Sequence, residues 1–398
     1  MRHLGMGWSP VDVEIVTTTD QFPSEHGLVM SRHSSGESMT MAIASTREKT
    51  AVTIPKTMRA FVLTGHGDQD MLEYREDYPL PIPGPDDVLI EVSACGINNT
   101  DINTRVGWYA SGGWGGDVEF PLIQGADPVG RVVSVGAGVD PHRVGQRVLV
   151  DAWIRAASGR IDEASYLGSE HNGGFAEYVS VPAVNAYPMD SDLSDVELAS
   201  FPCSYATAEH MLHRAKVGEG QWVLVTGASG GVGNALIQLA KCRGSRVVAL
   251  TSASKIYDVG RIGADVVLDR EMEDVDQAVL GETGGVDVIA DVVGGDLFPA
   301  LFETIRPGGH YTTAGAIGGP IVPLDLRTLY LSDITMHGAT VLPPVVFANL
   351  VSYIEAGEIK PIVAATYPLK KLAEAQREFM QKDHVGAFVI EIGEANES

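Results

Sequence analysis

A glycine-rich turn limits the fold of this chain more than any other stretch. The turn, TGASGGVG at residues 226–233, follows the apolar run WVLV and precedes the helical pattern NALIQLAKCR. Small residues in such a turn let a pyrophosphate approach the backbone, and the first N–H groups of the helix then face the phosphate. We therefore predict a dinucleotide-binding βα unit with these phosphate-facing residues: Ala228, Ser229, Gly230, Gly231, Val232 and Gly233. The alternative is a glycine turn that only closes a parallel βα unit.

From about residue 220 to residue 342, apolar strand-like runs alternate with helical patterns. The strand-like runs are QWVLVTG, SRVVALT, ADVVLD, VDVIADVVG, GGHYTTAG and ITMHGATV. Near-continuous apolar strands separated by helices indicate a parallel sheet that is covered on both faces. The glycine-rich turn belongs to the first βα unit of this predicted domain.

The chain before this region has the pattern of a β domain. From Met58 to about Pro188, strand-like runs such as MRAFVLTG, DVLIEVSACG and QRVLVDA are separated by turns. After Pro343 the chain returns to helix and then to the strand-like GAFVIEI. Residues 1–57 are polar and rich in serine and threonine, so we predict a flexible extension without a function of its own.

The charge balance narrows the class of partner. The 398 residues carry a formal net charge of −24, which disfavours binding to nucleic acid and to anionic membranes because no basic surface is available for phosphates. We therefore expect a small-molecule substrate. Three cysteines without a CxxC pair, and no apolar run long enough for a membrane span, predict a cytoplasmic protein.

The end of the second strand in the predicted parallel sheet indicates which nicotinamide cofactor binds. An acidic residue there would bind the ribose 2′-hydroxyl and repel a 2′-phosphate, but the position is Thr251. The residues that follow, Ser252, Ser254 and Lys255, offer hydroxyl donors and a positive charge to a phosphate. We predict NADP rather than NAD. The alternative for Lys255 is a solvated lysine at a helix start.

Several segments occur in an order and spacing that resemble a known family. They include ACGINNTD, IQGADPVGRVVSVGAGV, GGFAEYVSVPA, PCSYATA, VTGASGGVGNALIQLAK and RPGGHYTTAGA, between Met58 and Ile392. They resemble the medium-chain dehydrogenase/reductases, and within them the quinone oxidoreductase-like branch of the zinc-type alcohol dehydrogenase-like proteins. The resemblance implies an α/β fold with a GroES-like β domain at 58–188 and 343–398 and a Rossmann-like doubly wound parallel sheet domain at 189–342. It also implies an active site in the cleft and a homodimer joined through ITMHGATV.

The resemblance further implies which residues lie beside the cofactor. Asn98 and Thr207 match positions next to the nicotinamide in relatives. The loops that pass under the cofactor match Val293, Gly294, Gly315, Ala316 and Ile317. The alternatives are a turn-capping amide for Asn98 and a helix-face hydroxyl bonded to its own backbone for Thr207.

Zinc-dependent relatives polarise the substrate oxygen with a metal held by a cysteine, a histidine and a later cysteine. Here Cys95 and Cys203 hold the cysteine places, but Ala126 replaces the histidine and Asp127 replaces the glutamate that follows it. We predict that no metal binds and that both cysteines are small buried apolar residues. The alternative is a zinc site built from Cys95, Asp127, Cys203 and water.

Without a metal, a side chain or a ribose hydroxyl must supply the proton. Our leading catalytic candidate is Tyr109, whose phenol would donate to a developing enolate. Further candidates are Asn98, Thr100, Asp101 and Tyr205. The aromatic residues of the predicted cleft indicate an apolar or conjugated substrate: Trp108, Tyr109, Trp114, Trp153 and Tyr205. Arg155 either grips an acidic group of the substrate or lies on the surface.

The leading functional hypothesis is an NADPH-dependent oxidoreductase. It would transfer hydride, without a metal, to a quinone, an enone or another small carbonyl or activated alkene. The alternatives are a zinc-dependent alcohol dehydrogenase and an NADP-binding interaction protein with little turnover.

Overall fold

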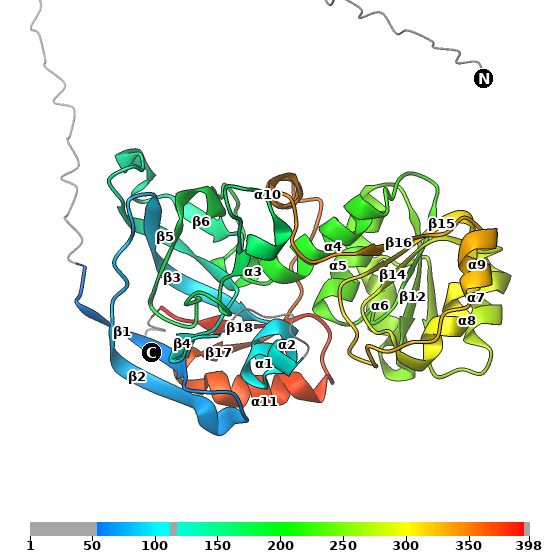
Figure 1. The fold of residues 1–398 in the computed structure, drawn as a ribbon, viewed down its shortest axis with the longest axis horizontal. Coiled ribbons are helices and arrows are strands. Elements are labelled where there is room, and N and C mark those ends of the chain that lie inside the picture. The colour runs from blue at the N-terminus through cyan, green and yellow to red at the C-terminus, as the bar shows by residue number, and fades with distance from the viewer. Residues whose placement is uncertain (1–53, 112–117, 394–398) are drawn as a thin grey trace, which may run out of the picture. The chain divides into compact units, whose positions relative to one another are not determined.

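Two large sheets of different character organise the chain (Figure 1). The computed structural model describes residues 54–111 and 118–393. Most of the predicted extension, and Trp114, therefore lie outside the described residues. The described residues hold the α/β fold that the sequence predicts.

The first large sheet is parallel and has six strands in the order β13-β12-β11-β14-β15-β16. The strands are β11 (Trp222–Val225), β12 (Arg246–Thr251), β13 (Val266–Asp269), β14 (Val286–Asp291), β15 (Ile305–Thr313) and β16 (Thr335–Gly338). The strand order reverses between β11 and β14, which confirms the predicted doubly wound sheet. Ligands of such sheets bind at the carboxyl ends of the strands, where the order reverses.

Both faces of this sheet are buried, as its apolar strands predict. Val223 and Val225 of β11 belong to one core, with α4 (Pro202–Arg214) and α5 (Gly231–Cys242). Leu224, between them, belongs to a second core with α8 (Phe298–Phe302). The remaining helices of this region are α6 (Ile256–Ile262), α7 (Val275–Thr283) and α9 (Leu326–Leu331). Side chains along β11 therefore alternate between two cores, one on each face of the sheet.

The second large sheet has seven strands, and the end of the chain completes it. Its order is β10-β6-β5-β3-β18-β17, with β9 also paired to β3. The strands are β3 (Asp87–Ile97), β5 (Asp127–Val135), β6 (Arg147–Val150), β9 (Tyr178–Pro182), β10 (Ala186–Pro188), β17 (Val363–Pro368) and β18 (Ala387–Glu391). Phe388 of β18 pairs with Ile97 of β3, so the red C-terminal strands lie beside the blue-cyan strands in Figure 1. The returning tail confirms the predicted closing strand.

Smaller elements complete the fold. A three-stranded sheet holds β1 (Thr57–Leu63), β2 (Leu72–Pro79) and β4 (Leu122–Ile123), and a two-stranded one holds β7 (Trp153–Ile154) and β8 (Ser165–Tyr166). The remaining helices are α1 (Asn99–Arg105), α2 (Trp108–Ser111), α3 (Asp195–Leu198), α10 (Pro344–Glu355) and α11 (Leu372–Gln381). Within the described ranges, no helix combines the length and apolarity that crossing a bilayer requires.

The start of the described chain already belongs to the fold. Ile54 packs against the core of the seven-stranded sheet, and the carbonyl of Lys56 accepts the N–H of Leu80 at 3.1 Å. The predicted domain boundaries stay predictions. Across one of them, α10 packs on α4.

Candidate cofactor site and active site

The glycine-rich turn is too crowded for larger side chains. Gly227 has a φ of +58°, in the region that favours glycine. A Cβ atom on Gly233 would lie 2.2 Å from the carbonyl oxygen of Gly227 and 2.7 Å from the Cα atom of Ala228. Because α5 begins at Gly231, its first N–H groups have no acceptor inside the helix. The turn therefore has the close approach and the free donors that a pyrophosphate needs.

A buried carboxylate at the end of β14 ties the turn to the next loop. Asp291 accepts hydrogen bonds from the hydroxyls of Thr226 and Tyr311, the latter at 2.7 Å. The same carboxylate accepts the N–H groups of Val293 at 2.8 Å and of Gly294 at 3.1 Å. Thr226 and Asp291 were not among the predicted site residues, although Thr226 begins the glycine-rich turn and Asp291 lies in a predicted strand-like run.

The loops predicted to pass under the cofactor meet at the glycine-rich turn. A Cβ atom on Gly227 would lie 3.2 Å from a methyl group of Val293, and one on Gly315 would lie 3.2 Å from the carbonyl oxygen of Val292. Gly294 bridges to Gly319, which closes the loop that holds Ala316 and Ile317. The carboxyl ends of β11, β14 and β15 thus converge, as a nucleotide crevice requires.

The predicted 2′-phosphate residues follow β12 on the same side of the sheet. The hydroxyls of Ser252 and Ser254 lie 3.3 Å apart. The ammonium of Lys255 donates to the carbonyl oxygens of Lys382 and of His384. Lys255 therefore points to the loop between α11 and β18 rather than outward.

That loop brings a second lysine to the site. The ammonium of Lys382 donates to Oδ1 of Asn99 at 2.8 Å and lies 3.7 Å from the centre of the Phe379 ring. Burial and the neighbouring Lys255 lower the pKa of Lys382 to about 8. The N–H of Gly386, in the same loop, approaches the carbonyl oxygen of Ser229 at 3.4 Å. The loop from Lys382 to Gly386 therefore borders the glycine-rich turn.

Three positive groups lie near the end of β12: Lys255, Lys382 and Arg270, of which Arg270 is paired with Glu271 at 3.4 Å. Burial lowers the pKa of Lys255, Asp383 favours its charged form, and Arg270, just after β13, disfavours it. Lysine–carboxylate ion pairs among the described residues involve Lys241, Lys370 and Lys371. Sequence reasoning missed Arg270 and Lys382, because Lys382 is separated from Lys255 by 127 positions in the chain.

Ser204, at the start of α4, lies between Asn98 and the glycine-rich turn. Its Nδ2 donates to Oδ2 of Asp127 at 2.8 Å, and its Oδ1 lies 3.4 Å from the hydroxyl of Ser204. A Cβ atom on Gly231 would lie 2.4 Å from that hydroxyl. Thr207, one helical turn after Cys203, hydrogen-bonds the Cys203 thiol. Asn98 and the start of α5 therefore both contact Ser204, and the contact of Asn98 with the nicotinamide stays a prediction.

Asp101 and Thr100 lie in the first turn of α1. Both oxygens of Asp101 accept backbone N–H groups, from Asn98 at 2.7 Å and from Gly125 at 3.2 Å. Burial raises the pKa of Asp101 to about 7. Asp101 therefore joins the backbone of Asn98 to the backbone of Gly125. Proton donation by Asp101 or Thr100 stays a prediction.

The predicted aromatic cleft is only partly assembled. The hydroxyl of Tyr109 accepts a hydrogen bond from Asn103 at 3.3 Å, and Trp108 is 48% exposed. Trp153 packs edge-on against Tyr166, with ring centres 4.7 Å apart. Sequence reasoning missed Tyr166, which lies in a strand of two residues.

Two predicted contact residues instead have partners within the protein. The buried hydroxyl of Tyr205 lies 3.1 Å from both Oδ1 of Asn234 and the carbonyl oxygen of Lys360. Arg155 binds the carboxylate of Asp151 and the carbonyl oxygen of Leu342, each at 2.7 Å. Arg155 therefore joins Asp151 to Leu342, and its guanidinium is not free to bind an acidic substrate.

The residues at the zinc position of relatives do not fit a catalytic zinc. Burial and the charge of Asp127 raise the pKa of both thiols, Cys95 and Cys203, which disfavours the thiolates that zinc needs. The phenol of Tyr166 donates to Cys203 at 3.4 Å, and both Asp127 oxygens accept N–H groups. Within residues 54–111 and 118–393, no group of three or more histidine, cysteine, aspartate or glutamate side chains is arranged to hold a metal ion.

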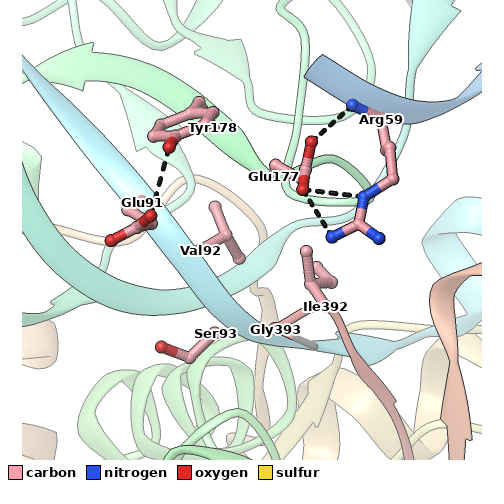
Figure 2. A pocket seen from close by; sticks show the side chains of 8 residues that line it. All are labelled: Arg59, Glu91, Val92, Ser93, Glu177, Tyr178, Ile392 and Gly393. Atoms are coloured by element: carbon pink, nitrogen blue, oxygen red, sulfur yellow. Dashed lines mark hydrogen bonds and ion pairs between the residues drawn. The ribbon is translucent and has the colours of Figure 1, made fainter. Parts of the chain in front are cut away.

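A separate depression of about 390 Å³ lies on the β domain (Figure 2). Its charged groups are already paired: Arg59 binds Glu177 at 2.6 Å, and Tyr178 donates to Glu91 at 3.1 Å. It shares no lining residue with the glycine-rich turn or with Asn98. We therefore place the chemistry at the turn and not in this depression.

Known proteins resemble the chain over both large sheets. Two family models match it, one described as alcohol dehydrogenase GroES-like domain at residues 84–191 and one as zinc-binding dehydrogenase at residues 231–356. The chloroplastic NADPH-dependent alkenal/one oxidoreductase of Arabidopsis thaliana is 28% identical over 341 residues, which are 85% of this chain and 80% of the relative. A quinone oxidoreductase-like protein 2 homolog of Nematostella vectensis is 30% identical over 322 residues, 77% of this chain and 82% of the relative.

A solved structure is also similar. It comes from Sinorhizobium meliloti 1021, is provisionally described as an alcohol dehydrogenase, and is 46% identical with a TM-score of 0.80. The match covers 85% of this chain and 97% of that one.

Proposed function

Because the chain belongs to the medium-chain dehydrogenase/reductase family, and is therefore an oxidoreductase, we propose that it is an NADPH-dependent reductase. It would transfer hydride, without a metal, to a quinone, an enone or another small carbonyl or activated alkene. The observation that carries the proposal is the cluster of hydroxyl and ammonium groups after β12, beside a turn shaped for a pyrophosphate.

The preference for NADPH rests on charge. A 2′-phosphate brings negative charge that Lys255, Lys382 and Arg270 together would offset, and the hydroxyls of Ser252 and Ser254 would donate to its oxygens. No acidic side chain ends β12, so nothing at that position repels the phosphate. NADH lacks the phosphate and would leave the two lysines unneutralised.

Metal-free chemistry is supported by the donor set at the zinc position. A catalytic zinc takes three protein ligands and keeps one open position. Here the buried thiol of Cys95, the partly buried thiol of Cys203 and one hydrogen-bonded carboxylate are present, and Ala126 supplies no ligand. When bound, the nicotinamide supplies the hydride. The protein then has to hold the acceptor and provide a hydrogen-bond donor, for which Tyr109, Thr100 and Tyr166 are the hydroxyl candidates.

The substrate class rests on the chemistry of the described side chains and on the relatives' names. Trp153 and Tyr166 form an aromatic pair beside Cys203, which suits a flat conjugated substrate. The Arabidopsis relative is named an alkenal/one oxidoreductase and the Nematostella relative a quinone oxidoreductase-like protein. Both names denote acceptors in which a carbonyl is conjugated to a double bond.

The deciding experiment is an oxidation screen with NADPH and with NADH. The purified chain, dialysed against a chelator, is offered quinones, enones and aldehydes, and its zinc content is measured by elemental analysis. We expect NADPH oxidation with quinones or enones at less than stoichiometric zinc. Activity that needs added zinc and appears with alcohols and NAD would instead identify a zinc-dependent alcohol dehydrogenase. NADPH binding without turnover would favour an interaction protein.

We also propose that the chain is a cytoplasmic homodimer joined along β16. In the described part of the chain β16 pairs with β15 alone, so its other edge is open. Nearby apolar side chains are exposed, including Tyr330, Leu331 and Met336. An open edge with exposed apolar neighbours favours pairing with a second copy. Light scattering of Met336→Lys against the unmodified chain tests this, since a monomer is expected from the variant only.

A further inference from the structure

Asp127 joins three segments at the centre of the candidate site. Its Oδ1 accepts the backbone N–H of Cys203 at 2.9 Å, and its Oδ2 accepts the side-chain N–H of Asn98 at 2.8 Å. The residue is 2% exposed. Burying a carboxylate costs free energy that hydrogen bonds must offset, so packing alone does not explain an aspartate here.

The carboxylate fixes the orientation of the Asn98 amide. The Nδ2 of the amide donates to Oδ2 of Asp127, so its Oδ1 points the opposite way. Burial raises the pKa of Asp127 to about 8, and the hydrogen bonds from Asn98 and Cys203 favour the ionised form, which only accepts hydrogen bonds. The backbone of Asn98 is held as well, because its N–H donates to Asp101 at 2.7 Å. A Cβ atom on Gly96 would lie only 2.9 Å from Oδ2 of Asp127, which shows how closely that oxygen is enclosed. Asp101 therefore binds the backbone N–H of Asn98, and Asp127 binds its side-chain amide.

The oxygen of Asn98 faces the start of the nucleotide-binding helix. It lies 3.4 Å from the hydroxyl of Ser204, which lies against Gly231. An amide oxygen in this place attracts a hydroxyl or an amide N–H₂ group and repels a phosphate. Both riboses of a nicotinamide dinucleotide carry hydroxyls, but a carboxamide N–H₂ group occurs only on the nicotinamide riboside half, beside which Asn98 is predicted to lie.

We propose that Asp127 is a positioning residue that sets the Asn98 amide so that its oxygen accepts a hydrogen bond from the nicotinamide riboside half of the cofactor. This inference rests on the proposed cofactor site. The competing explanation is that Asp127 only caps the start of α4 through Cys203. The two explanations differ in whether the effect of Asp127 passes through Asn98.

The substitution Asp127→Asn separates them. The new amide can still accept the N–H of Cys203, but it then presents its own N–H₂ group to Asn98. Asn98 must turn its oxygen toward that group and its N–H₂ away, toward Ser204. We expect the Kd for NADP⁺ to rise about tenfold, the size of one hydrogen bond to a charged or fixed partner. The Kd for 2′,5′-ADP, which lacks the nicotinamide riboside, is expected to stay within about twofold.

A double-mutant cycle tests the route of the effect. If Asp127 acts through Asn98, then Asp127→Asn has little further effect on NADP⁺ affinity once Asn98→Ala is present. The matched control is Asp151→Asn. Asp151 is an equally buried carboxylate that accepts the N–H of Trp153 at 3.1 Å and also pairs with Arg155 at 2.7 Å. This control is expected to lower the melting temperature and to leave the ratio of the two Kd values unchanged.

A spectroscopic measurement keeps the inference testable if Asp127→Asn does not fold. In the unmodified chain labelled with ¹⁵N-asparagine, the side-chain N–H₂ signal that disappears in Asn98→Ala should exchange slowly with solvent. A fast-exchanging signal would overturn the inference, and so would equal losses for NADP⁺ and 2′,5′-ADP or an undiminished effect in the Asn98→Ala background. Because these readouts need no turnover, a negative oxidation screen does not affect them. If the chain prefers NAD⁺, the same cycle is run with NAD⁺ and AMP.

Discussion

Replacing Lys255 with alanine is expected to weaken NADPH binding far more than NADH binding. The ammonium of Lys255 donates to the carbonyls of Lys382 and His384 at the border of the glycine-rich turn. Those acceptors are neutral and Asp383 favours the charged form of Lys255, so the lysine presents a positive charge to a 2′-phosphate. NADH offers no group at that position and gains nothing from the charge.

The structure limits the size of the effect. A hydrogen bond to a charged group contributes about 1.5–3 kcal/mol. Lys255 is only partly buried, and Lys382 and Arg270 remain nearby, so the lower part of this range applies. A loss of about 1.5–2 kcal/mol corresponds to about a 10–30-fold rise in the Kd for NADPH. Losing the two hydrogen bonds to Lys382 and His384 also loosens the loop between α11 and β18, and this should raise the Kd of both cofactors by less than about threefold.

The assay is a fluorescence titration with each cofactor at low and at physiological ionic strength. The loss for NADPH should shrink as salt rises, because salt screens a partly exposed charge. Lys241→Ala is the matched control, since Lys241 pairs with Asp265 at 2.8 Å on the surface of α5 and should affect neither cofactor. Equal losses for NADPH and NADH, at either ionic strength, would refute the reasoning.

Three further predictions concern other parts of the molecule. Because burial and Lys255 lower the pKa of Lys382 to about 8, the ammonium loses its charge as pH rises, so the NADPH-over-NADH affinity ratio should fall between about pH 7 and about pH 9. Lys382→Met should remove this dependence. Gly233→Ala places a Cβ atom 2.2 Å from a backbone carbonyl of the turn and should abolish dinucleotide binding in calorimetry, whereas Gly218→Ala, with nothing within 4 Å, should not. A chain beginning at Met58 should keep its NADPH affinity and lose a few degrees of melting temperature, because one backbone hydrogen bond near the start of β1 is removed.

The parallel sheet could be predicted because its signals are local. Its central strands β11, β12 and β14 are apolar runs, each followed by a turn and a helix, and the glycine-rich turn identifies the strand where the nucleotide crevice opens. The short strands β7 and β8 could not be predicted, because two residues are too few to show an alternation. Their pairing nevertheless places Tyr166 beside Trp153 and Cys203.

The identity of several candidate site residues could be predicted from the sequence, but their contacts with one another could not. The sequence singled out Asn98, Asp127 and Cys203, but it could not show that one carboxylate binds both other residues. Asp127 is 29 positions from Asn98 and 76 positions from Cys203, and no periodic pattern links such distances. Their meeting depends on the pairing of β3 with β5 and on the entry of α4. Lys382 was missed for the same reason, since the closing of the seven-stranded sheet brings it to Lys255.

The place of β18 in the middle of the seven-stranded sheet affects how the chain matures during synthesis. The parallel sheet is complete once Gly338 has left the ribosome, whereas residues 94–97 of β3 must wait for Ala387–Glu391 to pair on their second side. The nucleotide-binding half can therefore form during elongation, and the other half closes only after β18 has emerged. A chain truncated before Ala387 would have an intact glycine-rich turn and, at residues 94–97 of β3, an open edge that invites aggregation.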